Sequence, residues 1–352
     1  DLCVPPPAAK SYLNIGALIA AAREAGCDAV HPGYGFLSES PVFAEAVEQA
    51  GMIFVGPTAE TIRRMGDKAA ARSLALEAAV PVVPGSVGAV ATLDEAVSVA
   101  DEIGYPVMIK AAAGGGGRGI RIARSETELR SLAPQARTEA KAAFGDGALY
   151  LERALENPRH IEVQILGDGE RAVHCFEREC SLQRRRQKVW EEAPAICLSP
   201  ETREEICRSA VALAERVAYR GAGTLEYLYD EVTGEFFFIE MNTRIQVEHP
   251  VTEMITGIDI VAEMIKVAAG EPLSLRQENI TLRGHAIEVR VNAEDPANNF
   301  MPFPGVVGEL KVPGSPGVRF DTLLFEGYSI PPFYDALLGK LIVHGADRGD
   351  AV

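Results

Sequence analysis

The alternation of apolar runs with polar, glycine-rich and proline-rich stretches divides the start of the chain into short helix and strand units. Amphipathic spacing predicts helices over 12–25 and 40–50, and short apolar runs predict strands at 29–30 and 53–55. Helices that alternate with strands are typical of a parallel sheet covered by helices. Two such units are too small for a stable domain. We therefore expect at least one further strand and helix before Asp1 in the natural protein, or a chain that is a fragment.

The middle of the chain combines helices with short strands around a glycine-rich loop. The pattern predicts helices over 61–79 and 93–103, separated by a linker that contains prolines. Ser125, followed three residues later by Glu128, indicates a capping box at the start of another helix. Strands are predicted at 107–110, 120–122 and 149–152.

The remaining half of the chain has mainly the pattern of antiparallel strands, and the residues after His285 are again strand-rich. Two hairpins and an intervening helix are predicted, over 161–166 with 172–176, 223–229 with 236–239, and 200–219.

Composition limits the classes of function that the chain can have. Of 352 residues, 47% are hydrophobic, which supports globular domains with real cores, and the length indicates about two domains. The net charge of −16 argues against a nucleic-acid-binding protein, which normally carries a basic surface. Six cysteines without a C-x-x-C pair indicate reduced cytosolic or matrix thiols. There is no charged-then-apolar leader and no apolar run of about 18 residues, so we expect no membrane partner.

Two carboxylates at the second hairpin give the first indication of chemistry. Glu226 and Glu240 are equidistant from Thr233 in the turn, so we expect them to face each other on paired strands, about 5 Å apart. Two negative charges at that separation repel each other, and Mg²⁺ would relieve this repulsion because it bridges carboxylates and substrate phosphates. The alternative is a pair of solvated strand carboxylates, which these two residues alone do not exclude.

The glycine-rich segment 114–119 has the spacing G-x-G-x-x-G. A strand rather than a helix is predicted after it, so the segment does not indicate a dinucleotide-binding fold, and Lys110 precedes the glycines, unlike the lysine of a Walker loop. The N–H groups of a hairpin loop can instead close over phosphates, with Lys110 as a nearby charge. A merely flexible surface hairpin is the alternative.

The segment 183–188 (QRRRQK) places four cations in an otherwise acidic chain. The apolar Val189 and Trp190 follow directly, which indicates that part of this segment packs inward. We interpret the segment as one side of an anion pocket, and a solvated basic face is the alternative.

Six segments in this order resemble the ATP-grasp superfamily, and closely resemble the biotin carboxylase family within it. They are 31–39 (HPGYGFLSE), 65–68 (MGDK), 110–119, 156–160 (ENPRH), 180–188 with 191–194 (EEAP), and 240–253 (EMNTRIQVEHPVTE). The resemblance spans essentially the whole chain. It implies an ATP-grasp fold of mixed α/β and α+β class, with a truncated N-terminal parallel α/β domain and a strand-rich C-terminal domain. The implied divisions are an N-terminal domain at 1–56, a helical linker at 57–82, a lid with the glycine loop at 83–154, and a central and C-terminal domain at 155–352.

The resemblance also implies roles for particular residues. Contacts with ATP are expected from Lys68, Lys110, Gly115, Gly116, Gly117, Glu152, Leu155, His160, Gln183 and Leu228. A Mg²⁺ or Mn²⁺ ion is expected at Glu226, Glu240 and Asn242. The bicarbonate site is expected to comprise Lys188, Arg244, Gln246 and the backbone of Val247, with Glu248 as the general base. Arg319 is expected to hold the ureido oxygen of biotin, and Tyr34 is expected to lie near biotin.

The reaction that the resemblance implies is the ATP-dependent carboxylation of carrier-bound biotin with bicarbonate, through carboxyphosphate. This is the first half-reaction of a biotin-dependent carboxylase such as an acyl-CoA carboxylase. No Ala-Met-Lys-Met biotin-attachment motif occurs, so the implied partners, a biotin carrier and a carboxyltransferase, are expected beyond Val352 or on other chains. A homodimer or larger complex is implied, in a bacterial cytoplasm or a mitochondrial matrix. The alternatives are another ATP-grasp ligase that activates a different carboxylate, and an inactive nucleotide-binding fragment.

Overall fold

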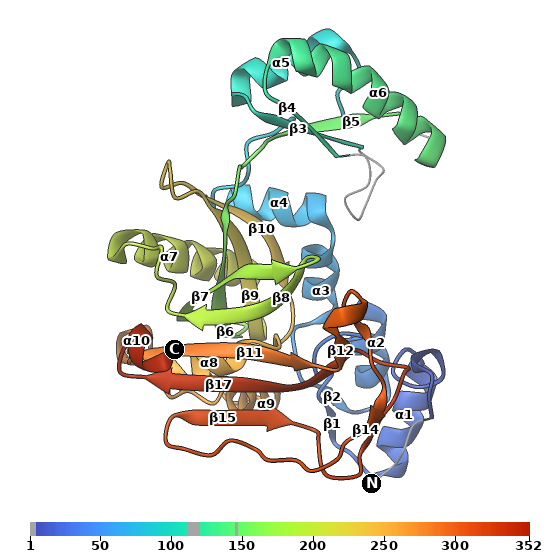
Figure 1. Cartoon of the computed structure of the whole chain (residues 1–352), viewed down its shortest axis with the longest axis vertical. Coiled ribbons are helices and arrows are strands. Elements are labelled where there is room, and N and C mark those ends of the chain that lie inside the picture. Colours follow the sequence, from blue (N-terminus) through green and yellow to red (C-terminus); the bar gives the residue numbers. More distant parts are fainter. Residues whose placement is uncertain (1–4, 112–119, 145–146) are drawn as a thin grey trace. The chain divides into compact units, whose positions relative to one another are not determined.

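The computed structural model describes residues 5–111, 120–144 and 147–352. These residues form two compact units (Figure 1). The first unit comprises Asp1–Val80, Arg159–Tyr229 and Phe238–Val352, and the second comprises Pro81–Pro158 and Asp230–Phe237. The predicted lid at 83–154 falls inside the second unit. Each unit is described by itself below.

The helices are α1 Ile15–Glu24, α2 Pro41–Gln49, α3 Ala59–Gly66, α4 Lys68–Glu77, α5 Leu93–Ile103, α6 Glu126–Phe144, α7 Pro200–Arg216, α8 His249–Thr256, α9 Ile260–Ala268 and α10 Arg348–Ala351. The strands are β1 Ala29–Val30, β2 Ile53–Phe54, β3 Val107–Ala111, β4 Arg121–Ala123, β5 Leu149–Arg153, β6 Arg159–Asp168, β7 Ala172–Arg184, β8 Gln187–Ala193, β9 Arg220–Tyr229, β10 Phe236–Asn242, β11 His285–Asn292, β12 Glu294–Asp295, β13 Met301–Pro302, β14 Gly305–Val306, β15 Val318–Thr322, β16 Ser329–Ile330 and β17 Leu337–Gly345. Within the described ranges, no helix combines the length and the apolar character that crossing a membrane requires.

The start of the first unit contains the predicted parallel strands. Strand β1 pairs with β2 in parallel, with Ala29 opposite Ile53. Helix α2 begins after Ser40, whose hydroxyl accepts the N–H of Phe43 at 3.2 Å as an N-cap. Phe43 and Phe54 then pack together in a buried apolar cluster with residues of the neighbouring helices. The prediction of helices packed on a parallel strand pair is confirmed.

The prediction of one helix over 61–79 is wrong, because two helices, α3 and α4, occupy this segment. Asp67 has extended backbone angles, with φ −85° and ψ 114°. Its carboxylate accepts the N–H of Ala70 at 2.9 Å and so caps α4. Aspartate favours an N-cap over a helix interior because its short side chain reaches the free N–H groups of the first turn. The break places Lys68 at the first position of α4.

The second unit is a small antiparallel sheet in the order β4-β3-β5, with α5 and α6 packed against it. Its core includes Ile109, Leu129 and Leu151, each 0% exposed. The predicted pair Ser125 and Glu128 caps the start of α6, although the glutamate binds the N–H before Ser125 instead of that of Ser125 itself. The hydroxyl of Ser125 accepts the N–H of Glu128, and the Glu128 carboxylate accepts the N–H of Arg124 at 2.8 Å.

Most of the first unit is built on a sheet in which the described residues place eight strands, in the order β10-β9-β6-β7-β8-β11-β17-β15. The predicted pairing of 161–166 with 172–176 is confirmed, since β6 pairs antiparallel with β7. The prediction ended the second of these strands too early, because β7 continues to Arg184 and turns directly into β8. Arg185 and Arg186 form that turn with positive φ angles of 52° and 67°. The basic segment 183–188 is therefore the tip of a long hairpin.

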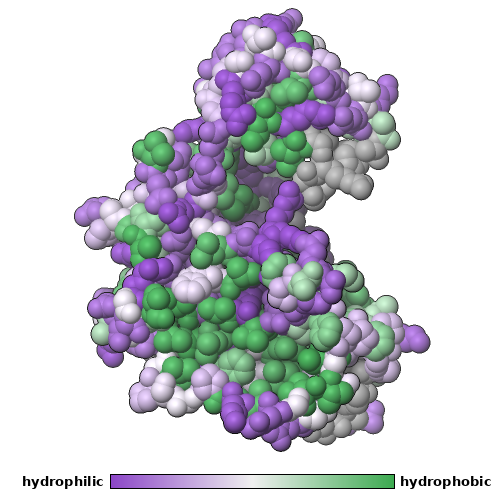
Figure 2. Space-filling view, in the orientation of Figure 1, coloured by the Kyte–Doolittle hydropathy of each residue, from purple (hydrophilic) through white to green (hydrophobic). Residues whose placement is uncertain are grey.

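Side-chain alternation gives β11, β17 and β15 two different faces. Val289, Leu341 and Phe320 lie opposite one another on one face. Figure 2 shows a continuous hydrophobic area over the region of these strands. An apolar area of this kind is typical of a surface that packs against another element or partner. The neighbouring positions Arg290 and Lys340 lie on the opposite face, which helix α8 covers.

Candidate functional site

A polar pocket in the first unit contains half of the predicted site residues. Its volume is about 380 Å³. Of the predicted residues, those that line it are His160, Gln183, Lys188, Glu226, Glu240, Asn242, Arg244, Gln246, Val247 and Glu248. Strands β6 to β10 and the loop before α8 therefore bring these side chains together, although they are spread over about ninety residues of sequence. Arg186, Arg290 and Asp335 also line the pocket.

Lys188 joins the carboxylates of this pocket. Its ammonium group donates to Glu162 at 2.6 Å, to Glu226 at 3.1 Å and to Glu248 at 2.7 Å. The side chain is 13% exposed. Burial alone would lower the pKa of Lys188, but the charges of Glu162 and Glu248 raise that pKa well above its usual range. Lys188 is therefore a fixed positive charge at the floor of the pocket.

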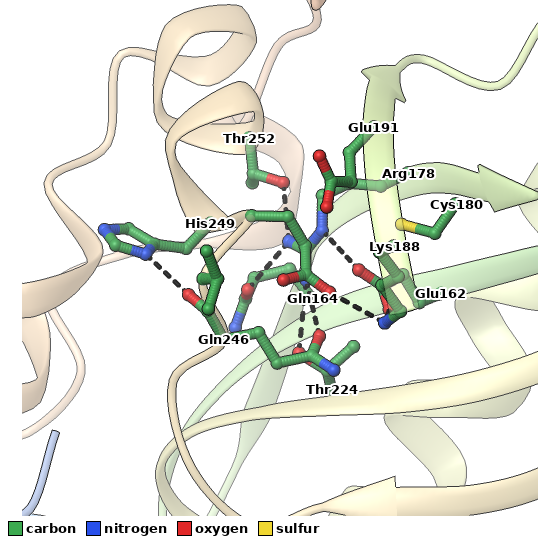
Figure 3. Close-up of polar contacts among 12 residues, drawn as sticks. Glu162, Gln164, Arg178, Cys180, Lys188, Glu191, Thr224, Gln246, His249 and Thr252 are labelled. Carbon is green, nitrogen blue, oxygen red and sulfur yellow. Dashed lines mark hydrogen bonds and ion pairs between the residues drawn. The ribbon is translucent and has the colours of Figure 1, made fainter. Parts of the chain in front are cut away.

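A second cation, Arg178, lies behind the pocket and is fully buried (Figure 3). Its guanidinium donates to Glu162 at 2.9 Å, to Gln246 at 3.0 Å and to Thr252 at 2.8 Å. Arg178 thus fixes a carboxylate of β6, an amide of the loop after β10 and a hydroxyl of α8. Sequence reasoning missed both Arg178 and Glu162. The sequence held a signal for them: Glu162 and Arg178 lie directly across from each other on the paired strands β6 and β7, where a negative and a positive side chain are expected to form an ion pair.

Glu226 is held on several sides by polar groups. Asn242 and Gln246 donate their amide groups to it at 2.8 and 2.9 Å, and a ring nitrogen of His160 lies 2.9 Å away. Burial would raise the pKa of Glu226, but the hydrogen bond from His160 and the charge of Lys188 lower that pKa to about 2. Glu226 therefore stays ionised.

Glu240 differs from Glu226 because no described residue forms a hydrogen bond or ion pair with its carboxylate. Burial and the negative charge of Glu226 raise the pKa of Glu240, whereas the charge of Lys68 lowers it. A carboxylate that lines a pocket beside another carboxylate, without a partner of its own, fits a site that takes a divalent cation. Oxygen groups of Glu226, Glu240 and Asn242 are the donors that Mg²⁺ prefers.

A tighter group of possible metal ligands is formed by His160, Glu162 and Glu226, whose ligand atoms all lie within 4.8 Å of one another. The ammonium of Lys188 already contacts both carboxylates of this group. We therefore regard the space between these two carboxylates as occupied by the ammonium of Lys188, and Glu240 as the carboxylate that needs a cation.

Glu248 precedes α8 and contacts two cations. One oxygen accepts from Lys188, and the other accepts from Arg290 at 3.0 Å. Glu248 is 2% exposed. These contacts fix the plane of the carboxylate at the edge of the pocket. Arg290 was not predicted, and its signal was the alternation in β11 of the polar residues Glu288, Arg290 and Asn292 with the apolar Val289 and Val291.

Arg290 also binds a second buried carboxylate. Its guanidinium donates to Glu191 at 2.7 Å. Burial raises the pKa of Glu191 to about 7, although the charge of Arg290 opposes this. Arg290 therefore lies between one carboxylate at the pocket and another behind it.

Arg244 is oriented by the loop that the segment 31–39 forms. Its guanidinium donates to Glu39 at 3.0 Å and to the side-chain oxygen of Asn242 at 3.0 Å. The Thr243 N–H also donates to Glu39, at 3.1 Å. The N-terminal part of the chain thus fixes the start of the loop that carries Gln246 and Glu248.

Arg319 is not brought to this pocket. Its guanidinium donates to Asp321 at 2.7 and 2.8 Å and to Glu253 at 2.6 Å. Tyr34 is also absent from the residues that line the pocket. Burial and the charge of Glu288 raise the pKa of the Tyr34 hydroxyl. Leu228 lies on β9 directly opposite His160.

Of the remaining predicted nucleotide contacts, Lys68 begins α4 in the first unit and is not among the residues that line the pocket, and the others belong to the second unit. Lys110 and Glu152 form an ion pair there, on the adjacent strands β3 and β5. Leu155 follows β5. Gly115, Gly116 and Gly117 lie outside the described residues.

Three protein-family descriptions match the chain in succession. They are biotin carboxylase, N-terminal domain, at residues 1–62, carbamoyl-phosphate synthase L chain, ATP binding domain, at 67–276, and biotin carboxylase C-terminal domain at 288–352. A biotin carboxylase of Pseudomonas aeruginosa is 55% identical over 355 aligned residues, which cover 100% of this chain and 78% of that protein.

Solved structures are similar over nearly the whole chain. The biotin carboxylase domain of a thermophilic 2-oxoglutarate carboxylase bound to bicarbonate is 47% identical with a TM-score of 0.93, and the match covers 99% of this chain and 77% of that one. The biotin carboxylase domain dimer of Hydrogenobacter thermophilus 2-oxoglutarate carboxylase, in complex with MgADP, ADP and bicarbonate, is 49% identical with a TM-score of 0.84 and the same two coverages. The mixed helix and strand architecture expected from the sequence agrees with both.

Proposed function

The chain belongs to the biotin carboxylase family, and we propose that the pocket around Lys188 is where it performs this chemistry. It is a ligase that carboxylates biotin with ATP, Mg²⁺ and bicarbonate. The observation that carries the assignment to this pocket is the buried ammonium of Lys188, bonded at once to Glu162, Glu226 and Glu248. Such an arrangement holds a base in one orientation and keeps a buried positive charge at the pocket.

Glu248 is the proposed general base. Bicarbonate becomes an effective nucleophile when it loses its proton, and a positioned carboxylate can accept that proton. One carbonate oxygen then forms a bond to the γ-phosphorus of ATP while the bond to the bridging oxygen breaks, which gives carboxyphosphate and ADP. Lys188 and Arg290 each bind one oxygen of Glu248, so the carboxylate is held in one orientation.

Cations of this chain offset the charge of the transferring phosphoryl group. We propose this role for Lys188 together with Lys68 and Lys110. Bound at Glu226, Glu240 and Asn242, Mg²⁺ would supply further positive charge to the phosphate oxygens. The raised pKa and unpaired carboxylate of Glu240 support that ligand set.

Carboxylation of biotin requires a base, and it requires a positively charged group that stabilises the negative charge on the ureido oxygen. In our proposal carboxyphosphate decomposes to CO₂ and phosphate, the phosphate takes the proton from N1′ of biotin, and the resulting enolate attacks CO₂. Arg290 is our first candidate for the ureido oxygen, because it lines the pocket and contacts Glu248. Arg319, which the family resemblance indicates for this role, is the second candidate.

A biotinyl carrier must present the substrate, and a carboxyltransferase must consume the product. We propose that both are components of the same assembly as this chain, and that the chain forms a homodimer as the Hydrogenobacter domain does. A cytoplasmic location stays a proposal, and the relatives described above give no support to a mitochondrial one.

Phosphate release from ATP tests the proposal. The full-length protein is supplied with ATP and Mg²⁺, bicarbonate is added or removed, and free biotin is titrated. Turnover that needs bicarbonate and rises with biotin, with carboxybiotin detected, is the expected result. Turnover that ignores both would instead support a different ATP-grasp ligase, and binding of ATP without turnover would indicate an inactive module.

A further inference from the structure

Gln246, Val247 and Glu248 form the turn that leads into α8. The backbone carbonyl groups of Gln246 and Val247 each accept a hydrogen bond from a side chain. The Gln246 carbonyl accepts from Nδ1 of His249 at 2.7 Å. The Val247 carbonyl accepts from the ammonium of Lys340 at 2.8 Å. Burial lowers the pKa of His249 to about 3, so its ring is neutral and Nδ1 carries the proton that it donates.

These two bonds determine where the neighbouring N–H groups point. Both peptide bonds are trans, so the N–H of Val247 points opposite to the Gln246 carbonyl, and the N–H of Glu248 points opposite to the Val247 carbonyl. Neither N–H donates a hydrogen bond to a residue that the structure describes. Val247 and Glu248 both line the pocket. Two free N–H groups at the start of a helix form a good site for an anion.

Lys340 reaches the turn from the sheet below it. It lies on β17 between Arg290 of β11 and Asp321 of β15, and it is 6% exposed. Its ammonium is 3.7 Å from the Asp321 carboxylate, so the carbonyl of Val247 is its closest partner among the described residues. A second carboxyl group, Glu288, is fully buried nearby, and neither of its oxygens has a hydrogen-bond partner in the described part of the chain.

Burying an ammonium group is costly unless it makes strong polar contacts. An apolar side chain would fill the same space beneath α8 without that cost. The contact that distinguishes lysine here is the bond to the Val247 carbonyl, which orients the peptide between Val247 and Glu248. That peptide joins the proposed bicarbonate contact to the proposed base.

We propose that Lys340 and His249 are positioning residues for bicarbonate: they hold two carbonyl groups away from the pocket so that the N–H groups of Val247 and Glu248 face the anion. This inference rests on the proposed function of the pocket. Neither side chain contacts bicarbonate itself in this arrangement.

The Lys340→Met variant removes the ammonium and keeps a side chain of similar length. Loss of one charge-assisted hydrogen bond corresponds to a change of roughly ten- to a hundredfold. We expect KM for bicarbonate to rise about tenfold or more, while KM for ATP stays within about twofold. The matched control is Lys311→Met, since Lys311 is 84% exposed and pairs with Glu309 at the surface. That variant is expected to keep the wild-type KM for bicarbonate.

If Lys340→Met does not fold, the variants His249→Leu and His249→Asn test the same orientation of the backbone N–H groups. Leucine removes the donor to the Gln246 carbonyl, whereas the side-chain amide of asparagine can replace Nδ1. We expect a raised KM for bicarbonate with leucine and a value close to wild type with asparagine.

The outcomes separate this inference from the proposed function. Wild-type protein without bicarbonate-dependent turnover would overturn both. Wild-type turnover with an unchanged KM for bicarbonate in Lys340→Met and His249→Leu would overturn the inference alone. Equal losses in the affinity for ATP, the affinity for bicarbonate and kcat would also overturn it, because they would indicate a general structural role.

Discussion

Two clusters of charge contact α8 or the turn before it, one at Glu248 and the other at Glu253, and they differ in burial rather than in contact distance. In the pocket cluster, Lys188 binds Glu162 at 2.6 Å and Glu248 at 2.7 Å. In the outer cluster, Arg319 binds Glu253 at 2.6 Å and Asp321 at 2.7 Å. The pocket side chains are 0–13% exposed, whereas in the outer cluster Arg319 is 35% and Asp321 31% exposed, with Glu253 at 11%.

This difference decides what each cluster can do. Exposed ion pairs contribute about 0–1 kcal/mol because water screens them. Removing one partner of a buried ion pair strongly destabilises the folded protein, because no water solvates the charge that remains. The comparison teaches that short ion pairs alone do not identify a functional site. We expect substitutions in the pocket cluster to have large effects and matched substitutions in the outer cluster to have small ones.

The largest effect is expected from Glu248→Gln. It removes the proposed base, and general-base catalysis contributes about 10²- to 10⁴-fold. Bicarbonate-dependent ATP turnover should fall by about a thousandfold, while the Kd for ATP should change by less than about twofold. The matched control is Glu253→Gln in the outer cluster, which should retain most of the turnover. Unchanged turnover in Glu248→Gln would remove Glu248 from this role.

Arg178→Met should have the next largest effect, on stability rather than on chemistry. It leaves Glu162 buried beside a single remaining cation and breaks the bonds to Gln246 and Thr252. Removal of one partner from a buried network costs about 3–5 kcal/mol of the unfolding free energy. Urea unfolding measures this value. For Arg319→Met the same experiment should give about 1 kcal/mol or less, and equal losses would contradict the comparison.

Arg290→Met and Arg319→Met decide which arginine serves biotin. We expect the rate of biotin carboxylation to fall about a hundredfold in Arg290→Met and by less than about threefold in Arg319→Met, because Arg290 lines the pocket. Carboxybiotin formation is measured beside ATP turnover in each variant. The opposite order would favour Arg319, as the family resemblance indicates.

The smallest effect is expected from the pH dependence of stability. The pKa of Glu226 is lowered from 4.5 to about 2 in the folded protein, so its stabilising contribution is complete well above 4.5 and is lost as the pH falls toward 2. Between about pH 5 and pH 3.5 this carboxylate should account for roughly 1 kcal/mol of the lost unfolding free energy. Glu226→Gln should lack that part of the decline in urea unfolding. Asp321→Asn in the outer cluster should change the decline less, and an equal change would contradict the comparison.

The sequence by itself determined the local elements and many of the chemical groups. Short apolar runs predicted β1 and β2, and the spacing of apolar positions predicted the hairpin of β6 with β7 and the bounds of α5. These patterns depend on neighbours within a few residues. The spacing of Glu226 and Glu240 about the turn at Thr233 indicated these two carboxylates for the same reason, whereas Asn242 and Arg244 were indicated by the family resemblance. The break between α3 and α4 was local as well, and the capping aspartate that causes it was overlooked.

Only the tertiary structure decided which charges meet. Lys188, Glu162, Glu226 and Glu248 come from β8, β6, β9 and the start of α8, and sheet pairing rather than spacing brings them together. The same pairing placed Arg290 at the pocket and left Arg319 bound to Asp321 and Glu253, outside the residues that line the pocket. Cross-strand contacts and burial depend on residues far apart in the chain. A local pattern therefore tells which side chains can carry charge, and the packed sheet determines which of them lose water and act together.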